Sequence, residues 1–466
     1  MSKYYLAIDI GASSGRHMLC RMDDGKLVME EIYRFENGMD NRNGRLYWDT
    51  ERLFKEIVAG LKKAGEMGKT LESVAVDTWA VDYVLTDEKG KVLAPSYGYR
   101  DIRINGMDEE VYRLFPERGL YEHTGIQHQS FNTIFQLMAS KINEPDALAN
   151  AKAMLMLPDY FNYRLTGVMK QEYTNATSTG LVNAASCDWD EDIIKALGYP
   201  RDIFLPIEMP GTLVGTFTDE IKSELGFDCK VVMAASHDTA SAVMAVPAIS
   251  GDVLYISSGT WSLMGVENME PITTGAAQIA NFTNEGGYER RYRFLKNIMG
   301  LWMIQQVRHE LNDKYSFAEL CDMAENEKEF PARVDVNDEC FLAPLNMQDA
   351  VRDYLSERGR SVPENTGQMA AVIYESLSDS YVQAVIEIEG LTGKHYDAIH
   401  IVGGGSNAAY LNRLTAQKTG RRVLAGPGEA TAIGNIMAQM IADGVFSNLR
   451  EARACVAESF EITEFA

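Results

Sequence analysis

The segment YYLAIDIGASSGRHMLCRMDDGKLVMEEIYRF, residues 4–35, contains three stretches rich in apolar residues that are separated by two short turns. The turn sequences GASSG and DDGK consist of small and polar residues, which favour tight reversals of the chain. The segment therefore predicts three meandering strands.

A helix and a further strand are expected next. Asp49 is a suitable N-cap, and apolar residues then recur with the helical period at Leu53, Phe54, Ile57, Val58 and Leu61. The segment LESVAVDTWAVDYVLTDEKGKVLA, residues 71–94, predicts another strand and a hairpin. Three meandering strands, a helix and a returning strand form an α/β unit with a mixed sheet.

A second unit is predicted to begin near Gly251. The segment DVLYISSGTWSLMGV (252–266) indicates strand, turn and strand, KNIMGLWMIQQVRHELN (296–312) a helix, and AIHIVGGGSNAAYLNRLTAQKTGRRVLAG (398–426) a strand–turn–helix–strand. The short likeness of LAIDIGASSGRHML to LYISSGTWSLMGV suggests two similar halves that face each other across a cleft. A chain of 466 residues is also too long for one core.

Composition narrows the classes of partner. The formal net charge of −23 argues against nucleic acid and anionic membranes, which attract a positive surface. A polyanion such as ATP can still bind through backbone N–H groups and a few local cations. We expect no membrane span and no signal peptide. We also expect a cytoplasmic location, because the six widely spaced cysteines fit free thiols in a reducing compartment.

The segment VVMAASHDTASAV, residues 231–243, has the composition of a protein core, yet His237, Asp238 and Thr239 stand in its middle. Burial of a carboxylate without a partner is costly. Asp238 is a good N-cap for a helix that begins at TASAVMAV, and it is also placed to serve as a catalytic acid or base. Both roles stay open from this segment alone.

Three glycine-containing turns each follow an apolar strand. These are DIGASSGR (9–16), SSGTWS (257–262) and VGGGSN (402–407). Each alone fits a hairpin or strand end as well as a phosphate loop, in which glycine lets the backbone approach a ligand closely. Three such turns in one chain favour nucleotide binding.

The chain as a whole resembles the FGGY family of carbohydrate kinases, within the actin/hexokinase-like superfamily. The matching segments occur in family order between residue 6 and about residue 436: AIDIGASSGR, VDTWAVDYVL, MLPDYFNYRLTG, EYTNATSTGLVNAASCDWD, ASHDTASAV, YISSGTWSLMG, NFTNEGGYERRYRFLKNIMGLW, IVGGGSN and GPGEATAIGN. Within the family, the chain is most similar to the kinases that phosphorylate L-rhamnulose.

The resemblance implies two α/β domains of the ribonuclease-H-like fold that face each other across a cleft. Residues 1–245 would form the N-terminal domain with the sugar side and the catalytic aspartate, and residues 246–466 the C-terminal domain with the nucleotide side. Asp238 would be the base that accepts the proton of the sugar's primary hydroxyl as its oxygen attacks the γ-phosphate of ATP.

The resemblance also implies roles for other positions. The sugar contacts would be Ala80, His237, Asp238, Thr239 and Asn297. The ATP contacts would be Ala12, Ser13, Ser14, Gly15, Arg16, Thr260, Gln305, Gly403 and Gly404. Asp9 would hold Mg²⁺, mainly through water, which suits an ion that keeps its hydration shell.

Several positions have alternative interpretations. His237 also fits a core histidine, Asn297 a helix cap, and Gln305 a surface residue on a helix. Asp77 and Asp82 would contact sugar hydroxyls or only satisfy N–H groups of a turn. The family's L-rhamnulose kinases, which the chain resembles most, commonly carry glycine where this chain has Ala80, and one added methyl group can alter sugar preference by about 1–3 kcal/mol.

Three functions therefore compete. The first is ATP-dependent phosphorylation of L-rhamnulose to L-rhamnulose 1-phosphate. The second keeps the chemistry and changes the sugar to L-fuculose or another deoxy-ketose. The third is a non-catalytic sensor of sugar or nucleotide, since a fold alone does not determine function. A sensor would need neither the base nor the metal site.

Overall fold

The computed structural model describes residues 3–248 and 252–466, which form two compact units. The first unit comprises the chain up to Ala245, together with Asn268–Phe294 and Thr431–Ser459. The second comprises Val246–Glu267, Leu295–Ala430 and Phe460–Ala466. The chain thus returns to the first unit twice. The predicted limits of 1–245 and 246–466 describe contiguous domains and stay a prediction.

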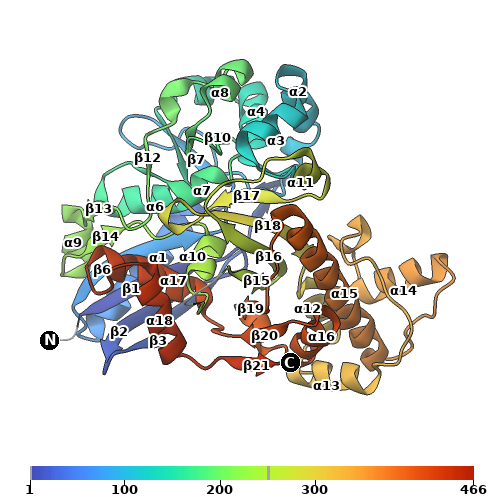
Figure 1. Cartoon of the computed structure of the whole chain (residues 1–466). Helices are drawn as coiled ribbons and strands as arrows, with labels where there is room; N and C mark the ends of the chain where they lie inside the picture. Colours follow the sequence, from blue (N-terminus) through green and yellow to red (C-terminus); the bar gives the residue numbers. More distant parts are fainter. Residues whose placement is uncertain (1–2, 249–251) are drawn as a thin grey trace. The chain divides into compact units, whose positions relative to one another are not determined.

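The first unit is built on a six-stranded mixed sheet in the order β13-β14-β6-β1-β2-β3 (Figure 1). The strands are β1 (Tyr4–Ile10), β2 (Ser14–Asp23), β3 (Lys26–Glu36), β6 (Leu71–Thr78), β13 (Leu213–Thr216) and β14 (Lys230–Val232). Strands β1, β2 and β3 pair antiparallel in sequence, while β6 is parallel to both β1 and β14. The meander predicted from residues 4–35 is confirmed.

The turn between β2 and β3 shows why the sequence folds this way locally. Asp24 and Gly25 have φ angles of 48° and 78°, as a two-residue hairpin with matching twist requires. Asp and Gly are among the residues that tolerate this left-handed region. The register from Asp23 opposite Lys26 to Arg21 opposite Val28 follows directly from this turn.

Helices pack on this sheet from distant parts of the chain. Asp49 caps α1 as predicted, and its side chain accepts a hydrogen bond from the N–H of Arg52. The chain's last long helices, α17 and α18, drawn in red in Figure 1, also belong to this unit. The helices are α1 (Thr50–Glu66), α2 (Met107–Leu114), α3 (Glu117–Thr124), α4 (Thr133–Asn143), α5 (Pro145–Asn150), α6 (Leu157–Thr166), α7 (Tyr173–Thr177), α8 (Glu191–Leu197), α9 (Asp219–Leu225), α10 (Asp238–Met244), α11 (Gly275–Ile279), α17 (Ala430–Ala442) and α18 (Leu449–Ser459).

Short strands complete the first unit. They are β4 (Asp40–Arg42), β5 (Arg45–Tyr47), β7 (Tyr83–Thr86), β8 (Ala153–Met156), β9 (Gln171–Glu172), β10 (Val182–Asn183), β11 (Asp188–Trp189), β12 (Ile207–Glu208) and β17 (Thr283–Gly286). The segment after residue 82 forms β7, which pairs with β8. It also begins a short hairpin, as predicted: a bridge joins Thr86 to Val92, and the N–H groups of Leu93 and Asp87 donate to the carbonyls of Leu85 and Lys91.

The second unit carries most of a sheet in which the strands follow the order β17-β18-β16-β15-β19-β20-β21; β17 and the first three residues of β18 are assigned to the first unit. These strands are β15 (Leu254–Ser258), β16 (Trp261–Asn268), β18 (Tyr292–Met299), β19 (Ala398–Val402), β20 (Arg422–Ala425) and β21 (Thr463–Phe465). β15 pairs antiparallel with β16 and parallel with β19, as the two sequence segments predict. The helices are α12 (Trp302–Glu310), α13 (Phe317–Asn326), α14 (Met347–Glu357), α15 (Thr366–Thr392) and α16 (Ala409–Thr419).

One predicted element of the second unit is wrong in its extent. The segment 296–312 was expected to be a single helix, but β18 continues to Met299 and α12 begins only at Trp302. Gly300 separates them, and a Cβ on this residue would lie 2.5 Å from the backbone of Trp261. The close passage past a neighbouring turn ends the strand, and sheet pairing overrides the helical spacing of the apolar residues.

Within residues 3–248 and 252–466, no helix combines the length and the apolar character that a bilayer crossing needs. All six cysteines are free thiols, as their spacing predicts.

Candidate active site

Three carboxylates gather where strands of the first sheet end. Asp9 is the last but one residue of β1, and Asp77 lies beside it on β6 in the parallel register. Asp238 follows the chain out of β14 and begins α10. The loop before it is tied to β6, because the N–H of Thr78 donates to the carbonyl of Ser236 at 3.0 Å. The topology therefore brings residues 9, 77 and 238 to one edge.

Arg16 stands opposite Asp9 on β2 and neutralises it. The guanidinium Nε and Nη2 lie 3.0 and 2.9 Å from Asp9 Oδ2. This pair is largely shielded from solvent, so its interaction is less screened than that of a surface pair. Arg16 was expected to meet a phosphate, and in this structure its side chain holds the strand-end acid instead.

Asp77, which the sequence offers either as a sugar contact or as an acceptor for N–H groups of a turn, is fully buried. Its Oδ2 accepts a hydrogen bond of 2.6 Å from the side-chain amide of Asn435 on α17, while its Oδ1 has no hydrogen-bond partner. Burial raises the pKa of Asp77 well above its usual value, and the carboxylates of Asp9 and Asp238 raise it further. Asp77 therefore favours its neutral form, which lets two carboxyl groups occupy neighbouring strands.

Asp238 is not the N-cap of its helix, so that part of the prediction is wrong. His237 occupies the N-cap position, and Asp238 is the first residue of α10. Its Oδ1 accepts hydrogen bonds from the N–H and the hydroxyl of Thr239 at 2.5 and 3.1 Å. Burial and the charge of Asp9 raise the pKa of Asp238, and His237 and Thr239 oppose this rise. With 32% of its side chain exposed, the carboxylate is open to a reactant.

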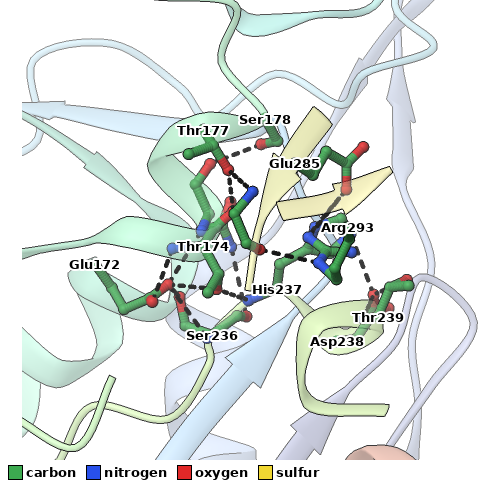
Figure 2. A network of polar contacts seen from close by, with 12 residues as sticks. Glu172, Thr174, Thr177, Ser178, Ser236, His237, Asp238, Thr239, Glu285 and Arg293 are labelled. Carbon is green, nitrogen blue, oxygen red and sulfur yellow. Dashed lines mark hydrogen bonds and ion pairs between the residues drawn. The ribbon is translucent and has the colours of Figure 1, made fainter. Parts of the chain in front are cut away.

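The backbone before Asp238 is held by Glu172, a buried carboxylate that the sequence did not single out (Figure 2). Its Oε2 accepts hydrogen bonds from the N–H and the hydroxyl of Ser236 at 3.2 and 2.6 Å, and from the N–H of Asn175. The hydroxyl of Thr174 donates to the same oxygen and accepts from the N–H of His237. The positions of residues 236 and 237 are thus fixed by the start of α7.

The His237 ring is held from the other side (Figure 2). Its Nδ1 lies 3.0 Å from Nη2 of Arg293 and 3.3 Å from Glu285 Oε2, and its Nε2 lies 3.4 Å from Asp238 Oδ1. Arg293 has no exposed surface and pairs with Glu285 at 3.0 Å. Burial disfavours the charge of Glu285, but Arg293 and His237 outweigh it and lower its pKa to about 2. Neither Glu285 nor Arg293 was predicted.

The turn after β6 is lined by side chains. The N–H of Asp82 donates to the carbonyl of Ala80 around Val81, whose φ of 70° is rare for a β-branched residue. Asp82 Oδ2 accepts from the indoles of Trp48 and Trp79 at 2.5 and 2.9 Å, and Oδ1 from Gln136. Both oxygens of Asp82 therefore hold side chains around the turn. Ala80 stays partly exposed beside them.

The predicted phosphate loop at residues 11–16 is a hairpin. The N–H of Gly11 donates to the carbonyl of Ser14, and Ala12, Ser13 and Ser14 are exposed or half-buried. Gly15 has a packing role, because a Cβ there would lie 2.1 Å from the ring of Phe35. Only the tip of the hairpin is accessible to a ligand.

In the second unit, the glycine turn after β19 packs on the end of β15. Gly403 has a φ of 82°, and a Cβ on it would lie 2.9 Å from the carbonyl oxygen of Ser258. A Cβ on Gly405 would lie 1.9 Å from the Ser258 hydroxyl, whereas Gly404 has open space. The chain therefore needs glycine at 403 and 405 so that the turn after β19 can approach β15. Gly404 is the accessible member of the three.

Thr260 and Gln305 are linked through the start of α12. The N–H of Trp302 donates to the carbonyl of Thr260 at 3.1 Å, and the N–H of Leu301 to that of Gly259. Thr260 is exposed at the tip of the hairpin, and Gln305 lies half-buried on α12. Asn297 is on strand β18 and caps no helix; its buried Oδ1 has no hydrogen-bond partner.

The predicted site residues thus form two groups. The first unit holds Asp9, Ala12, Ser13, Ser14, Gly15, Arg16, Ala80, His237, Asp238 and Thr239, and the second holds Thr260, Asn297, Gln305, Gly403 and Gly404. Sequence reasoning missed the buried polar residues that support the first group. One signal for Arg293 was available, since it is a charge between two aromatic residues in a strand.

Comparison with known proteins identifies the family. Residues 4–245 match the N-terminal domain of the FGGY family of carbohydrate kinases, and residues 254–442 match the family's C-terminal domain. The chain belongs to the FGGY family of carbohydrate kinases.

Relatives with similar sequences span almost the whole of this kinase. The rhamnulokinase of Halalkalibacterium halodurans is 48% identical over 462 residues, which cover 99% of this chain and 98% of the relative. The rhamnulokinase of Bacillus subtilis is 41% identical over 99% of this chain and 94% of its own. The recognition of the family from sequence is confirmed.

Solved structures of more distant proteins share the fold. A xylulose kinase from Lactobacillus acidophilus superposes with a TM-score of 0.80 at 15% identity, covering 99% of this chain and 93% of that one. A glycerol kinase from Plasmodium falciparum, solved with ADP, gives 0.78 at 13% identity, with coverage of 99% and 94%. The predicted fold class, two α/β units of the actin/hexokinase-like kind, is confirmed.

Proposed function

We propose that this kinase transfers the γ-phosphoryl group of ATP to the primary hydroxyl of L-rhamnulose and releases L-rhamnulose 1-phosphate and ADP. The similarity to rhamnulokinases of 48% and 41% over nearly the full chain supports the choice of sugar. The family membership supports the reaction class.

The position of Asp238 is the observation that carries the mechanism. One carboxylate oxygen is held by Thr239, and the side chain is partly exposed at the first turn of a helix. In the proposed step Asp238 accepts the hydroxyl proton, the sugar oxygen forms the new bond to the γ-phosphorus, and the bond from that phosphorus to the ADP oxygen breaks. The raised pKa of Asp238 makes it a better base than a fully solvated aspartate.

We assign the sugar to the first group of residues and to Asn297. His237 and Thr239 flank the base, Ala80 lies at the turn after β6, and Asn297 offers a buried oxygen without a hydrogen-bond partner. A ketose would supply hydroxyl donors for such an acceptor.

We assign ATP to the glycine turns. The tip of the first hairpin, Ala12 to Ser14 with Gly15 and Arg16, would meet the phosphates. Thr260, Gln305, Gly403 and Gly404 would meet the rest of the nucleotide. The accessible hydroxyl of Thr260 and the open space at Gly404 support this assignment.

Asp9 is the residue we assign to Mg²⁺. Magnesium in phosphoryl-transfer enzymes takes one or two carboxylates together with water and phosphate oxygens, so a single strand-end carboxylate fits it. When bound, the ion neutralises charge on the phosphates. Arg16 would then share Asp9 with it or turn to the phosphates.

We place the kinase in the cytoplasm, where ATP is available and six free thiols stay reduced. Its partners would be the two small substrates. The net charge of −23 supports neither nucleic acid nor an anionic membrane as a partner.

The test is ADP release by the purified chain with L-rhamnulose, L-fuculose and L-xylulose, with Mg²⁺ and with excess chelator. We expect the highest kcat/KM with L-rhamnulose and no turnover with chelator. A higher kcat/KM with L-fuculose would favour the second sugar, which we consider because Ala80 stands where a glycine is common. Sugar binding without ADP release from any ketose would support a sensor and overturn the proposal.

A further inference from the structure

The side chain of Arg293 defines which nitrogen of His237 carries the proton. A guanidinium has five N–H donors and no acceptor, and it stays protonated in proteins. Its Nη2 lies 3.0 Å from His237 Nδ1 in a geometry that directs a hydrogen at that nitrogen. Nδ1 must therefore present its lone pair, and the neutral ring carries its proton on Nε2.

Glu285 holds the guanidinium in that place. Its Oε2 lies 3.0 Å from the same Nη2, and the carbonyl of Gly286 accepts a hydrogen bond of 2.9 Å from Arg293 Nε. Glu285 and Gly286 end β17, and Arg293 lies on β18, the strand beside it in the sheet. Figure 2 shows Glu285 and Arg293 beside His237. Glu285 Oε2 is also 3.3 Å from His237 Nδ1, so Glu285 would accept a proton from this nitrogen if Arg293 were absent.

The opposite ring nitrogen faces the base. His237 Nε2 lies 3.4 Å from Asp238 Oδ1, the oxygen that also receives both hydrogen bonds from Thr239. In the residues described, no hydrogen bond reaches Asp238 Oδ2. A proton on His237 Nε2 thus lies on the side of the ring nearest Oδ1, at an N–O separation of 3.4 Å, and leaves Oδ2 to take the hydroxyl proton of the acceptor.

We propose that Arg293, oriented by Glu285, is a positioning residue that fixes His237 with its proton on Nε2, so that this N–H faces Asp238 and the acceptor sugar. The proposal rests on the proposed function, because it takes Asp238 as the base. Arg293 itself touches neither substrate; it acts through His237.

The direct test is the ¹⁵N spectrum of the histidine rings in the full chain, with the His237 signals identified by their loss in His237→Asn. We expect the unmodified protein to show an acceptor Nδ1 and a protonated Nε2. In Arg293→Met the nearest partner of Nδ1 becomes Glu285, so we expect the proton to move to Nδ1. A protonated Nδ1 in the unmodified protein overturns the proposal whatever the variants do.

Kinetics provide the second readout. For Arg293→Met we expect kcat to fall about 10- to 100-fold, the range for removal of a group that orients another ligand, with the KM for ATP changed less than about 2-fold. Glu285→Gln keeps the Arg293 donor, so we expect its Nε2 proton to remain and its loss of kcat to be smaller. A folded Arg293→Met protein with the Nε2 proton and unchanged kcat contradicts the proposal.

Arg333→Met is the matched control. Arg333 forms an ion pair with Glu375 in the second unit at the same N–O separation of 3.0 Å. Loss of that pair should leave the His237 signals and kcat unaltered.

If Arg293→Met does not fold, the spectra of the unmodified protein and of Glu285→Gln still decide. If no ketose is phosphorylated, or if Asp238→Asn keeps its activity, the proposed function fails while the ring spectrum still tests the tautomer.

Discussion

The two sheets share a pattern of parallel and antiparallel strand pairing, but their strand ends carry different chemistry. In the order β3-β2-β1-β6-β14-β13, a strand pairs antiparallel with its hairpin partner and parallel with the next, and the order β18-β16-β15-β19-β20-β21 repeats this from β16 onward. The final strand pairs antiparallel in both sheets. Both sheets of this kinase therefore contain the same run of antiparallel, parallel, parallel and antiparallel pairs.

Equivalent positions show what differs. Asp9 pairs with Asp77 at the end of β1 and β6, and at the same level Ser257 pairs with Val402 on β15 and β19. The following turn contains Trp79 and the strained Val81 in the first sheet, but Gly403 with its neighbours in the second. The first sheet thus presents side chains and the second presents backbone.

The largest expected effect comes from Asp238→Asn, which removes the acid chemistry of the first sheet and keeps its shape. We expect kcat to fall by a factor on the order of 10² to 10⁴, because asparagine accepts the Thr239 hydrogen bonds but takes no proton. Steady-state ADP release and thermal unfolding would measure this. Asp49→Asn is the control, since Asp49 only caps α1 and asparagine caps equally well. Near-native turnover of Asp238→Asn would refute the base.

Gly403→Ala tests the second sheet, where backbone has to approach closely. Alanine at a φ of 82° with its Cβ 2.9 Å from Ser258 O is strained by about 1–3 kcal/mol, so the turn should move. We expect the KM for ATP to rise about 10- to 100-fold while the KM for the sugar changes little.

Gly359→Ala separates this effect from backbone strain alone. Gly359 also has a positive φ, of 63°, but a Cβ there meets nothing within 4 Å. We expect a lower melting temperature and an unchanged KM for ATP. Equal changes of both substrates' KM values in Gly403→Ala would place the turn outside the nucleotide site.

His17 of β2 and Met264 of β16 also occupy equivalent positions, opposite Ile8 and Ile256. His17 is fully buried, and this burial lowers its pKa to about 4 from an ordinary value of 6.5. The unfolded chain therefore binds a proton below pH 6.5 that the folded chain binds only near pH 4. Stability should fall across this window, by about 2 kcal/mol at pH 5 relative to pH 7.5.

His17→Met introduces the residue that the second sheet has at the equivalent position. This variant should lose the part of the pH dependence of stability that comes from His17. Urea unfolding at pH 7.5 and pH 5 would measure the difference, with His309→Gln as control because His309 is 79% exposed. An equal loss of stability in His17→Met and the unmodified chain would show that other groups cause the acid sensitivity.

Local signals in the sequence were sufficient for the elements that form locally. The turn at Asp24 and Gly25, the cap at Asp49 and the hairpin around Thr260 are each determined within a few residues, and each was predicted correctly. Residues 296–299 were predicted as helix because their apolar spacing has two solutions, and the neighbouring strand selects one.

The supporting polar contacts of the site could not be predicted in this way. Glu172 holds Ser236 across 64 residues, and Arg293 reaches His237 across 56. No local pattern encodes such pairs; only the packed fold brings them together. The resemblance to a family supplied the candidate residues themselves, while their assigned roles stay predictions.

The smallest expected effect concerns Ala80, where one methyl group distinguishes this turn from a glycine turn of the kind seen after β19. Ala80 is partly exposed next to Trp79 and the strained Val81, and its own carbonyl accepts the N–H of Asp82, so the turn has little freedom to move its Cβ aside. If this Cβ faces the ketose, Ala80→Gly should change the ratio of kcat/KM between L-rhamnulose and L-fuculose about 10-fold, since one methyl group in a pocket contributes about 1–3 kcal/mol. ATP parameters should stay constant, because Ala80 lies in none of the turns that we assign to the nucleotide. The two sugars and L-xylulose, measured side by side for both proteins, give the answer. Unchanged ratios with unchanged stability would mean that the methyl group points away from the sugar and that the first sheet controls specificity through other side chains.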